Sequence, residues 1–313
     1  MAVNFRALTM DCSRLSQRFA ELRKEFGRAE SKMAYLCLAP AMLTILVWLV
    51  YPTLAAIYYS FTRYDPLSTP EWIGLQNYVR LLDHRTFLIS VTNTLKYTAA
   101  IIPGSMASGL LFAILVNQKI PLRGLFRTAF YAPYVVSLVA IAMIFQWIFH
   151  PDFGFANALL DNLSLPRQRW LGDPQQALPT VTMMSIWRDA GYSMIIYLAG
   201  LQSIPDTLYE AAMIDGANRW QRFLFVTLPL LAPFTFFLFV MGIVRSLQVF
   251  TQVLILTQGG PMNATTSVVH QMWLTAFAYQ KMGLASAMAI LLMLAILLVT
   301  IVNLKFLSPE SVY

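Results

Sequence analysis

Six stretches of mostly apolar residues, each about as long as a bilayer-spanning helix, divide the sequence. A helix crosses the hydrocarbon core with about 20 residues, and the windows cover approximately residues 34–61, 91–116, 125–149, 178–201, 228–250 and 283–307. The last, with MAILLMLAILLVTIVNL unbroken by charge, is the clearest, and the fourth is the weakest because it contains Arg188 and Asp189. The first window follows 33 hydrophilic residues and is too long for the apolar region of a signal peptide. The pattern predicts an all-α integral membrane protein with six transmembrane helices.

Composition agrees with a membrane protein and excludes several other classes. Hydrophobic residues make up 58% of the chain and charged residues 12%, whereas soluble domains have about 25% charged residues. The net charge is +7, but the basic residues are spread over loops and form no patch interleaved with aromatic residues, so nucleic acid is not an expected partner. The two cysteines and three histidines have no metal-ligand spacing, and neither a disulfide nor a metal is expected.

The distribution of Lys and Arg sets the expected orientation. With the amino terminus inside, thirteen of these residues fall in inner segments and six in outer ones. The positive-inside rule therefore places both termini in the cytoplasm. Residues 1–33 have apolar side chains spaced by three and four among basic ones, which favours an amphipathic helix on the inner membrane surface; a solvated helix remains the alternative. Residues 34–307 form the predicted transmembrane domain, and 308–313 a cytoplasmic tail. Two long outer loops, about 62–90 and 150–177, are suited to receive a partner.

Nucleotide-binding and catalytic motifs are absent from the sequence. No stretch matches GxxxxGK[ST]. The nearest segment, Gly104-Ser-Met-Ala-Ser-Gly109, lies inside the second window, where small residues allow close helix packing. There is no HExxH, and no Ser/His/Asp or Cys/His set converges. We therefore expect no catalytic residue and no enzyme activity.

A polar segment, residues 203–229, separates the fourth and fifth windows on the expected cytoplasmic side. Asp206 is the predicted N-cap of a short helix that contains TLYEAAMID, and Gly216 is the residue favoured just after a helix end. A second short helix, ANRWQRFLFV, leads to Leu228-Pro229. Ala211 and Ala212 leave a low surface that another backbone can approach, and Glu210 projects one charge from it. The segment is expected to be a small, stiff protrusion joined to two spans.

The order of residues in this segment resembles the EAA loop of permease subunits in binding-protein-dependent ABC importers. The string IPDTLYEAAMIDGANRWQRFLFVTLPLL is similar to the carbohydrate-uptake branch of that family. YPTLAAIYYSFTRYDP, WIGLQNYVRLL and NTLKYT resemble its first-span region, and LTQGGPMNATTS its loop between spans five and six. The resemblance extends over about residues 35–307, with the motifs in the family's order.

The resemblance implies a type I ABC importer permease fold in the bacterial inner membrane. It implies that a cytoplasmic ATPase dimer, which uses ATP and Mg, receives the EAA loop, so that this chain itself binds no cofactor. A second permease subunit, usually a paralogue, and an extracytoplasmic solute-binding protein are the other implied partners, and a sugar or related polyol or glycoside is the implied solute. The ATPase-coupling residues are then Glu210, Ala211, Ala212, Asp215 and Gly216.

Two other classes of protein are alternatives to an importer permease. A secondary, ion-coupled transporter tends to show inverted repeats or broken helices with ion ligands, and no convincing repeat is found. Its proton relay would depend on Asp189, the one acidic residue within a span. A membrane receptor or scaffold would explain the spans but not the EAA order.

Polar residues inside spans four and five predict the substrate path, because ionisable groups in a membrane usually face a cavity. Their spacing puts each set on one helical face, and such groups can bind sugar hydroxyls while an aromatic ring packs against the sugar. The maltose permease of the family has its sugar contacts at most of these positions; only Tyr192 is retained here, which argues against maltose itself. The predicted path residues are Ser185, Asp189, Tyr192, Gly242, Arg245, Ser246, Val249 and Gln252.

An alternative role for two of these residues is structural. Asp189 and Arg245 could form an interhelical ion pair that only holds the bundle together. Arg188 is expected on a different face from Asp189, because neighbours on a helix diverge by about 100°, and could instead meet the partner permease.

Overall fold

The computed structural model describes residues 29–118 and 121–306, which fall into two units divided after Tyr58. The described residues of the first unit form one helical run made of α2 (Ala29–Ile45), a π-helical turn η2 (Leu46–Val50) and most of α3 (Tyr51–Ser60), whose last two residues belong to the second unit. Residues Met33–Ser60 of this run are long and apolar enough to cross a membrane, which confirms the helix predicted over 34–61. The amphipathic segment predicted within 1–33 and the tail 308–313 lie outside the described residues, except for residues 29–33.

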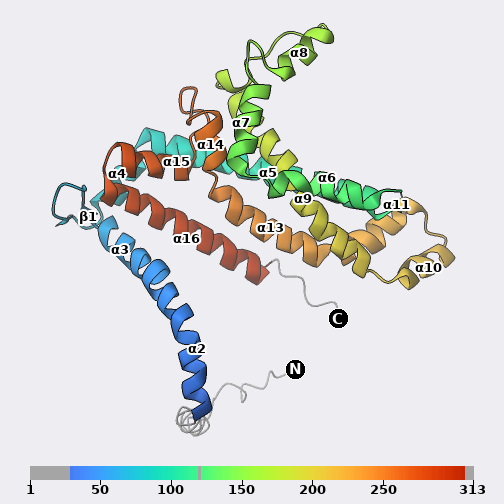
Figure 1. Cartoon of the computed structure of the whole chain (residues 1–313), viewed down its shortest axis with the longest axis horizontal. Helices are drawn as coiled ribbons and strands as arrows, with labels where there is room; N and C mark the ends of the chain where they lie inside the picture. Colours follow the sequence, from blue (N-terminus) through green and yellow to red (C-terminus); the bar gives the residue numbers. More distant parts are fainter. Residues whose placement is uncertain (1–28, 119–120, 307–313) are drawn as a thin grey trace, which may run out of the picture. The chain divides into compact units, whose positions relative to one another are not determined.

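The second unit is built around two helices, α5 (Arg85–Asn117) and α9 (Ala177–Ser203), which lie side by side (Figure 1). Both contribute to two buried apolar clusters, one shared with α7 (Leu138–Ile148) and α14 (Thr251–Leu256), the other with α13 (Ala232–Leu247). The last helix, α16 (Met282–Phe306), packs with α4 (Gln76–Asp83) and α15 (Val268–Trp273). The central α5–α9 pair therefore supports most of the other helices.

Small residues explain how closely α5 and α9 approach. A Cβ added at Gly104 would lie 2.5 Å from Cδ1 of Ile186, and one at Gly109 would collide with Cβ of Ser193. At Gly109 backbone atoms of α9 also stand in the way, so only glycine fits, whereas at Gly104 the end of the Ile186 side chain would have to move. The packing role predicted for the Gly104–Gly109 segment is confirmed.

The third predicted span is wrong as a single helix. α6 (Arg123–Val135) and α7 meet at an angle of 95°. Val136 and Ser137 have extended backbone conformations (ψ of 148° and 125°), so the helical hydrogen-bond ladder ends there and the chain changes direction. Apolar side chains continue through this turn, which is why hydrophobicity along the sequence did not reveal it.

The fifth predicted span is also interrupted. A helical run from Arg219 to Leu230, composed of α11 (Arg219–Arg222), the π-helical η4 (Phe223–Thr227) and α12 (Leu228–Leu230), meets α13 at 61°. Pro233 lies in the first turn of α13, where its missing N–H costs nothing. At the other end, α13 stops at Leu247 and α14 begins at Thr251, so the window 228–250 contains a bend and a helix end.

By length and hydrophobicity, the described residues contain three helices able to cross a membrane, or five if each bent pair is one span. α9 is not among them although it is a continuous helix of 27 residues. Arg188 and Asp189 lie within it and lower its hydrophobicity, as expected for the weakest window. The protein is thus a mostly helical membrane protein, and its least apolar long helix, α9, lies at the centre.

The first long loop folds against the start of α16. Strands β1 (Thr62–Arg63) and β2 (Glu71–Trp72) pair antiparallel, and α4 follows. The Asn77 side chain donates to the carbonyls of Ser60 and Thr62 at 2.9 and 2.8 Å, and Gly283 N–H donates to Tyr64 O at 3.0 Å. The second long loop contains α8 (Phe155–Asn162) and a 3₁₀ turn, η3 (Trp170–Gly172). Both loops are ordered by side-chain hydrogen bonds to backbone groups.

Candidate functional site

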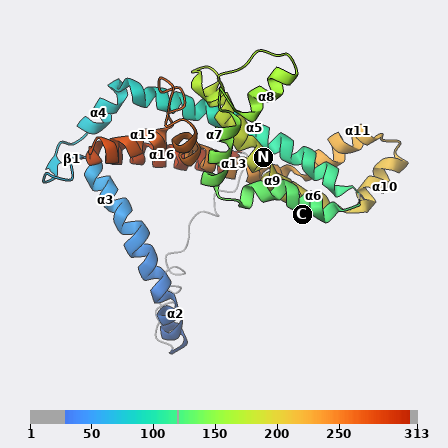
Figure 2. The ribbon, with the colours of Figure 1, turned by 45° about the horizontal axis from the view of Figure 1, so that its top comes forward.

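The EAA loop (residues 203–229) forms a protrusion at one end of the second unit. Figures 1 and 2 place α10 (Asp206–Ile214) and α11 together at this end, away from β1 and α4. The predicted N-cap at Asp206 is wrong: Pro205, in extended conformation, precedes the helix, and Asp206 is its first residue. There the carboxylate is still favourable because the helix dipole is positive at its N-terminus.

Gly216 ends α10 in the conformation that requires glycine. Its φ is +78°; Gly216 N–H donates to Met213 O at 3.1 Å and Ala217 N–H to Ala212 O at 2.9 Å. These two bonds form the Schellman motif, which satisfies carbonyls at a helix end. A Cβ at Gly216 would meet no atom within 4 Å. The backbone conformation, and not lack of space, is therefore what favours glycine here.

Side-chain hydrogen bonds stiffen the rest of the loop. Asn218 caps α11 by accepting from Gln221 N–H at 2.9 Å, while Gln221 Oε1 accepts from Asn218 N–H at 2.8 Å. This reciprocal pair is a capping box. The hydroxyls of Tyr209 and Thr227 lie 3.0 Å apart and join α10 to the end of η4. The two short helices are thus tied to each other and to the base of α12.

The exposed side of α10 combines carboxylates with apolar side chains. Glu210, Ala211, Asp215 and Gly216 are exposed, and Ala212 is half-buried. Ile214 is 87% exposed, a large fraction for an isoleucine. No ion pair in the described part of the chain involves Glu210. A stiff surface with exposed apolar residues and an available carboxylate is suited to contact another protein.

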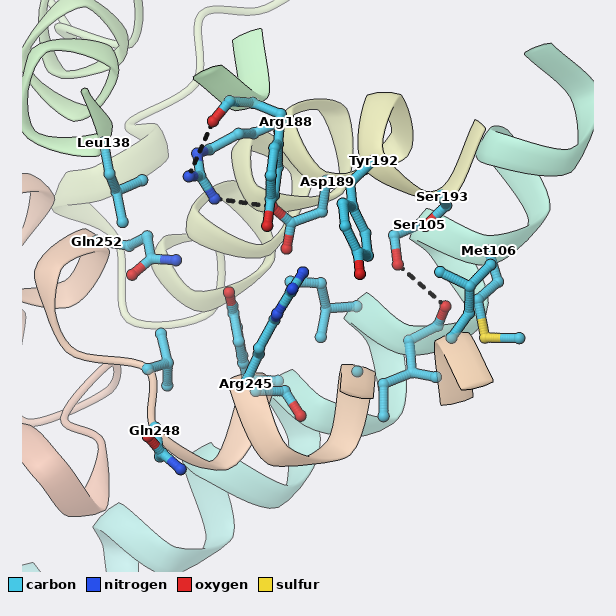
Figure 3. A pocket seen from close by; sticks show the side chains of 18 of the residues that line it. Ser105, Met106, Leu138, Arg188, Asp189, Tyr192, Ser193, Arg245, Gln248 and Gln252 are labelled. Atoms are coloured by element: carbon cyan, nitrogen blue, oxygen red, sulfur yellow. Dashed lines mark hydrogen bonds and ion pairs between the residues drawn. The ribbon is translucent and has the colours of Figure 1, made fainter. Parts of the chain in front are cut away.

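A cavity of about 320 Å³ lies among helices of the second unit (Figure 3). Its wall is formed by residues of α5, α6, α7, α9, α13 and α14. Ser185, one of the eight predicted path residues, is not part of the wall; it is buried and donates to Val181 O at 2.9 Å. The other seven line the cavity: Asp189, Tyr192, Gly242, Arg245, Ser246, Val249 and Gln252.

The predicted single face of span five is wrong in detail. Because α13 ends at Leu247, Val249 lies in the connection and Gln252 on α14. The chain turns here and brings both residues back to the cavity that Gly242 and Arg245 line from α13. Val249 and Gln252 thus share a wall of the cavity with Arg245, although the helix whose spacing predicted a shared face ends before them.

The expected separation of Arg188 from Asp189 is also wrong. Arg188 Nη1 lies 2.9 Å from Asp189 Oδ1, with the two side chains 18% and 23% exposed, and both residues line the cavity. Arg188 Nη2 also donates to Tyr134 O at 3.4 Å. The 100° divergence holds for Cβ atoms, but the long arginine side chain bends back over its neighbour. Among the described residues, Asp189 forms its ion pair with Arg188 and none with Arg245, so the alternative of an Asp189–Arg245 pair is contradicted.

Aromatic rings take the place of a carboxylate beside Arg245. Its Cζ lies 4.2 Å from the ring centroid of Tyr192 and 5.7 Å from that of Tyr134. Arg188 also contacts Tyr134, with its Cζ 4.9 Å from the centroid of the ring. A ring face attracts a cation, so these contacts stabilise both guanidinium groups. Tyr134 was not predicted, because it precedes the 95° bend that the sequence did not reveal.

The described residues, 29–118 and 121–306, contain no group of three or more His, Cys, Asp or Glu side chains that could hold a metal ion. The cavity offers hydroxyl, amide, guanidinium and carboxylate groups together with tyrosine rings. Such a wall is suited to bind a polar solute.

Apolar helices, a polar cavity among them and a stiff exposed loop together define the membrane subunit of a transporter. Residues 105–310 match the family described as the binding-protein-dependent transport system inner membrane component. The chain belongs to this family, which confirms the resemblance of the EAA loop. The alternative of an ion-coupled transporter finds no support.

Curated relatives and solved structures agree with this membership. The chain is 34% identical to the trehalose/maltose transport system permease protein MalF of Thermococcus litoralis, over 88% of this chain and 94% of the relative. It is 31% identical to the sulfoquinovosyl glycerol transport system permease protein SmoG of Agrobacterium fabrum, over 89% and 91%. A chain of a bacterial ABC transporter involved in the import of the acidic polysaccharide alginate superposes with a TM-score of 0.81, at 26% identity, covering 91% of this chain and 97% of that one.

Proposed function

We propose that this chain is the permease subunit through which an ATP-driven importer moves a sugar, or a related polyol or glycoside, across the bacterial inner membrane. The observation that carries the proposal is the direct connection of the EAA loop to two helices of the cavity wall. The relatives named for trehalose/maltose and sulfoquinovosyl glycerol, and the solved alginate importer, support a glycoside as solute. Both termini and Glu210 lie in the cytoplasm, and the two long loops outside.

The partners of this subunit follow from its membership and its missing nucleotide motif. A cytoplasmic ATPase dimer binds ATP and Mg and receives α10, so this chain has no catalytic residue and binds no cofactor. Glu210 pairs with a basic residue of the ATPase, while Ala211 and Ala212 allow close approach. A second permease subunit, a paralogue, completes the path, and an extracytoplasmic binding protein delivers the solute to the outer loops.

The geometry provides a mechanical route from the EAA loop to the cavity. α9 carries Asp189 and Tyr192, and ends at Ser203, immediately before α10. The distance along the helix axis from Asp189 to Ser203 is about 20 Å at 1.5 Å per residue. On the other side, the run from Arg219 to Leu230 joins α13, which carries Arg245. A movement of α10 and α11 therefore tilts two walls of the cavity together.

Reconstitution of the complete complex tests this function. The chain would be co-expressed with its partner permease and ATPase, purified, and placed in liposomes with the binding protein outside. We expect co-purification of the ATPase, and solute uptake that requires ATP inside the liposomes. Uptake that follows an imposed proton or sodium gradient without ATP would disprove the proposal.

A further inference from the structure

Arg245 brings to the cavity a positive charge that forms no ion pair with a carboxylate in the described part of the chain. The charged residues of the wall are Arg188, Asp189 and Arg245. Asp189 is held by Arg188 at 2.9 Å, so these two charges neutralise each other. Within residues 29–118 and 121–306, no ion pair of Arg245 is found; its side chain contacts the rings of Tyr192 and Tyr134. The cavity wall therefore has a net charge of one positive unit.

The contact with Tyr192 holds the Arg245 guanidinium in a position from which it can bind a ligand. A guanidinium that lies over a ring is stabilised through its face, while its N–H donors, which lie in the plane of the group, stay available. Figure 3 shows Arg245 reaching from α13 into the cavity beside Tyr192, with the Arg188–Asp189 pair opposite. The tyrosines hold the side chain in one place at the cavity, so less conformational entropy is lost when a ligand binds.

An uncompensated charge at membrane depth is costly, and such groups usually serve a function. A planar, bidentate donor set matches oxyanions such as carboxylate and phosphate. Neutral sugar hydroxyls would leave the charge unbalanced, whereas one oxyanion would cancel it. We infer that the solute is a glycoside bearing one negatively charged oxyanion, and that Arg245 binds this group while the Arg188–Asp189 pair and Gln252 face the hydroxyls. This inference rests on the proposed import of a glycoside and specifies its charge.

Two matched series of solutes test the charge of the ligand. The complete complex in proteoliposomes, supplied with its binding protein, would be offered maltose as a neutral probe and maltobionate, which bears a single carboxylate, as the carboxylate probe. Sulfoquinovosyl glycerol and glucosyl glycerol form a second pair that differs in a sulfonate, and distinguish the two kinds of oxyanion. We expect uptake and stimulated ATP hydrolysis to favour an anionic member over its neutral counterpart by at least about tenfold, because a hydrogen bond to a charged group contributes that much or more.

The variants Arg245→Gln and Arg245→Lys test whether Arg245 causes the preference for the anionic probe. Arg245→Gln should reduce the apparent affinity for the anionic probe about ten- to hundredfold and that for a neutral probe much less, so that the preference for the anion is lost. Arg245→Lys retains the charge and should keep the preference for the anion, with weaker binding because the bidentate geometry is lost.

The other outcomes each decide the question. Preference for the neutral probes, unchanged in Arg245→Gln, would disprove an anionic solute but leave glycoside import standing. Failure of both series to be taken up or to stimulate ATP hydrolysis would disprove glycoside import itself. If Arg245→Gln prevents assembly of the two permeases, as judged by gel filtration, Arg245 balances a carboxylate of the partner subunit and the inference is wrong.

Discussion

At the scale of single residues, Gly216 gives the clearest prediction. A side chain at this position would have room, but its backbone would have to keep a positive φ. Valine at this position must adopt a positive φ, which costs about 1–2 kcal/mol for a residue with a Cβ and more for a β-branched one. Gly216→Val should distort the end of α10 and lower ATP-driven uptake strongly. The measurement is uptake by proteoliposomes with the variant present at wild-type amounts.

Gly216→Asn is the matched control, since asparagine tolerates the left-handed conformation and the site is open. We expect this variant to keep most of the uptake. Equal losses in both variants would show that the exposed backbone of Gly216, and not its φ, is what the ATPase contacts.

Glu210 carries the second prediction at this scale. Glu210→Ala removes the charge and keeps the helix propensity of α10, so the fold should survive while ATPase stimulation and uptake are lost. Asp206→Asn, which removes another exposed charge from the same helix, should change uptake little. The measurements are co-purification of the ATPase and solute-stimulated ATP hydrolysis. Wild-type values of both for Glu210→Ala would show that Glu210 does not couple this chain to the ATPase.

Seven of the eight path residues predicted from the sequence line the cavity, but the sequence did not reveal the rest of the wall or the ion pair within it. The i, i+3, i+4 spacing on α9 placed Asp189 and Tyr192 correctly on one face because the helix is continuous there. It failed for Arg188, since a long flexible side chain is not confined to the direction of its Cβ. It could not find Tyr134 either, because that contact depends on how the chain turns between α6 and α7.

At the scale of elements, the α5–α9 contact should tolerate no side chain at Gly109. A Cβ there would meet Cβ of Ser193 and backbone atoms of Met194 and Ala190, and backbone cannot move aside locally. Gly109→Ala should therefore destabilise the protein by about 1–3 kcal/mol, as overpacking does, despite the better helix propensity of alanine. Thermal unfolding of the detergent-solubilised complex would measure this.

Gly124→Ala provides the control for helix propensity. Gly124 is also helical, but a Cβ there meets no atom within 4 Å. Alanine gains about 1 kcal/mol of helix propensity over glycine, so this variant should be as stable as wild type or more so. If Gly109→Ala were equally stable, the two helices would not be as close as described.

The helices themselves were predictable and their bends were not. Continuous apolar stretches fixed the positions of α5, α9 and α16, because each is one uninterrupted helix. The turn at Val136–Ser137 falls within a mostly apolar stretch of sequence, and the residues on both sides of the end of α13 at Leu247 line the cavity. An interruption of a helix inside a membrane protein is tolerated where the backbone borders protein or a cavity. The hydrophobicity of the sequence does not show where such an interruption lies.

At the scale of the whole molecule, the orientation in the membrane is the remaining prediction to test. The excess of Lys and Arg in inner segments puts Glu210 in the cytoplasm, and the outer loops on the other side. Single cysteines would be introduced at Glu210, Phe153 and Asn263 after replacement of Cys12 and Cys37, and intact cells treated with a membrane-impermeant thiol reagent. Phe153 and Asn263 are exposed; Gly154 is unsuitable, because a Cβ there would collide with the carbonyls of Ile148 and His150.

We expect labelling at positions 153 and 263, and labelling at 210 only after the cells are opened. The result bears on the mechanism as well as on topology, because α9 joins the two sides: it begins after the 150–177 loop and ends at α10. If 210 is cytoplasmic and 153 is outside, the solute-facing residues of α9 lie between the side of delivery and the side of ATP hydrolysis, as a coupled importer requires. Labelling of 210 but not of 153 in intact cells would reverse the orientation, and a cytoplasmic ATPase could then not reach Glu210.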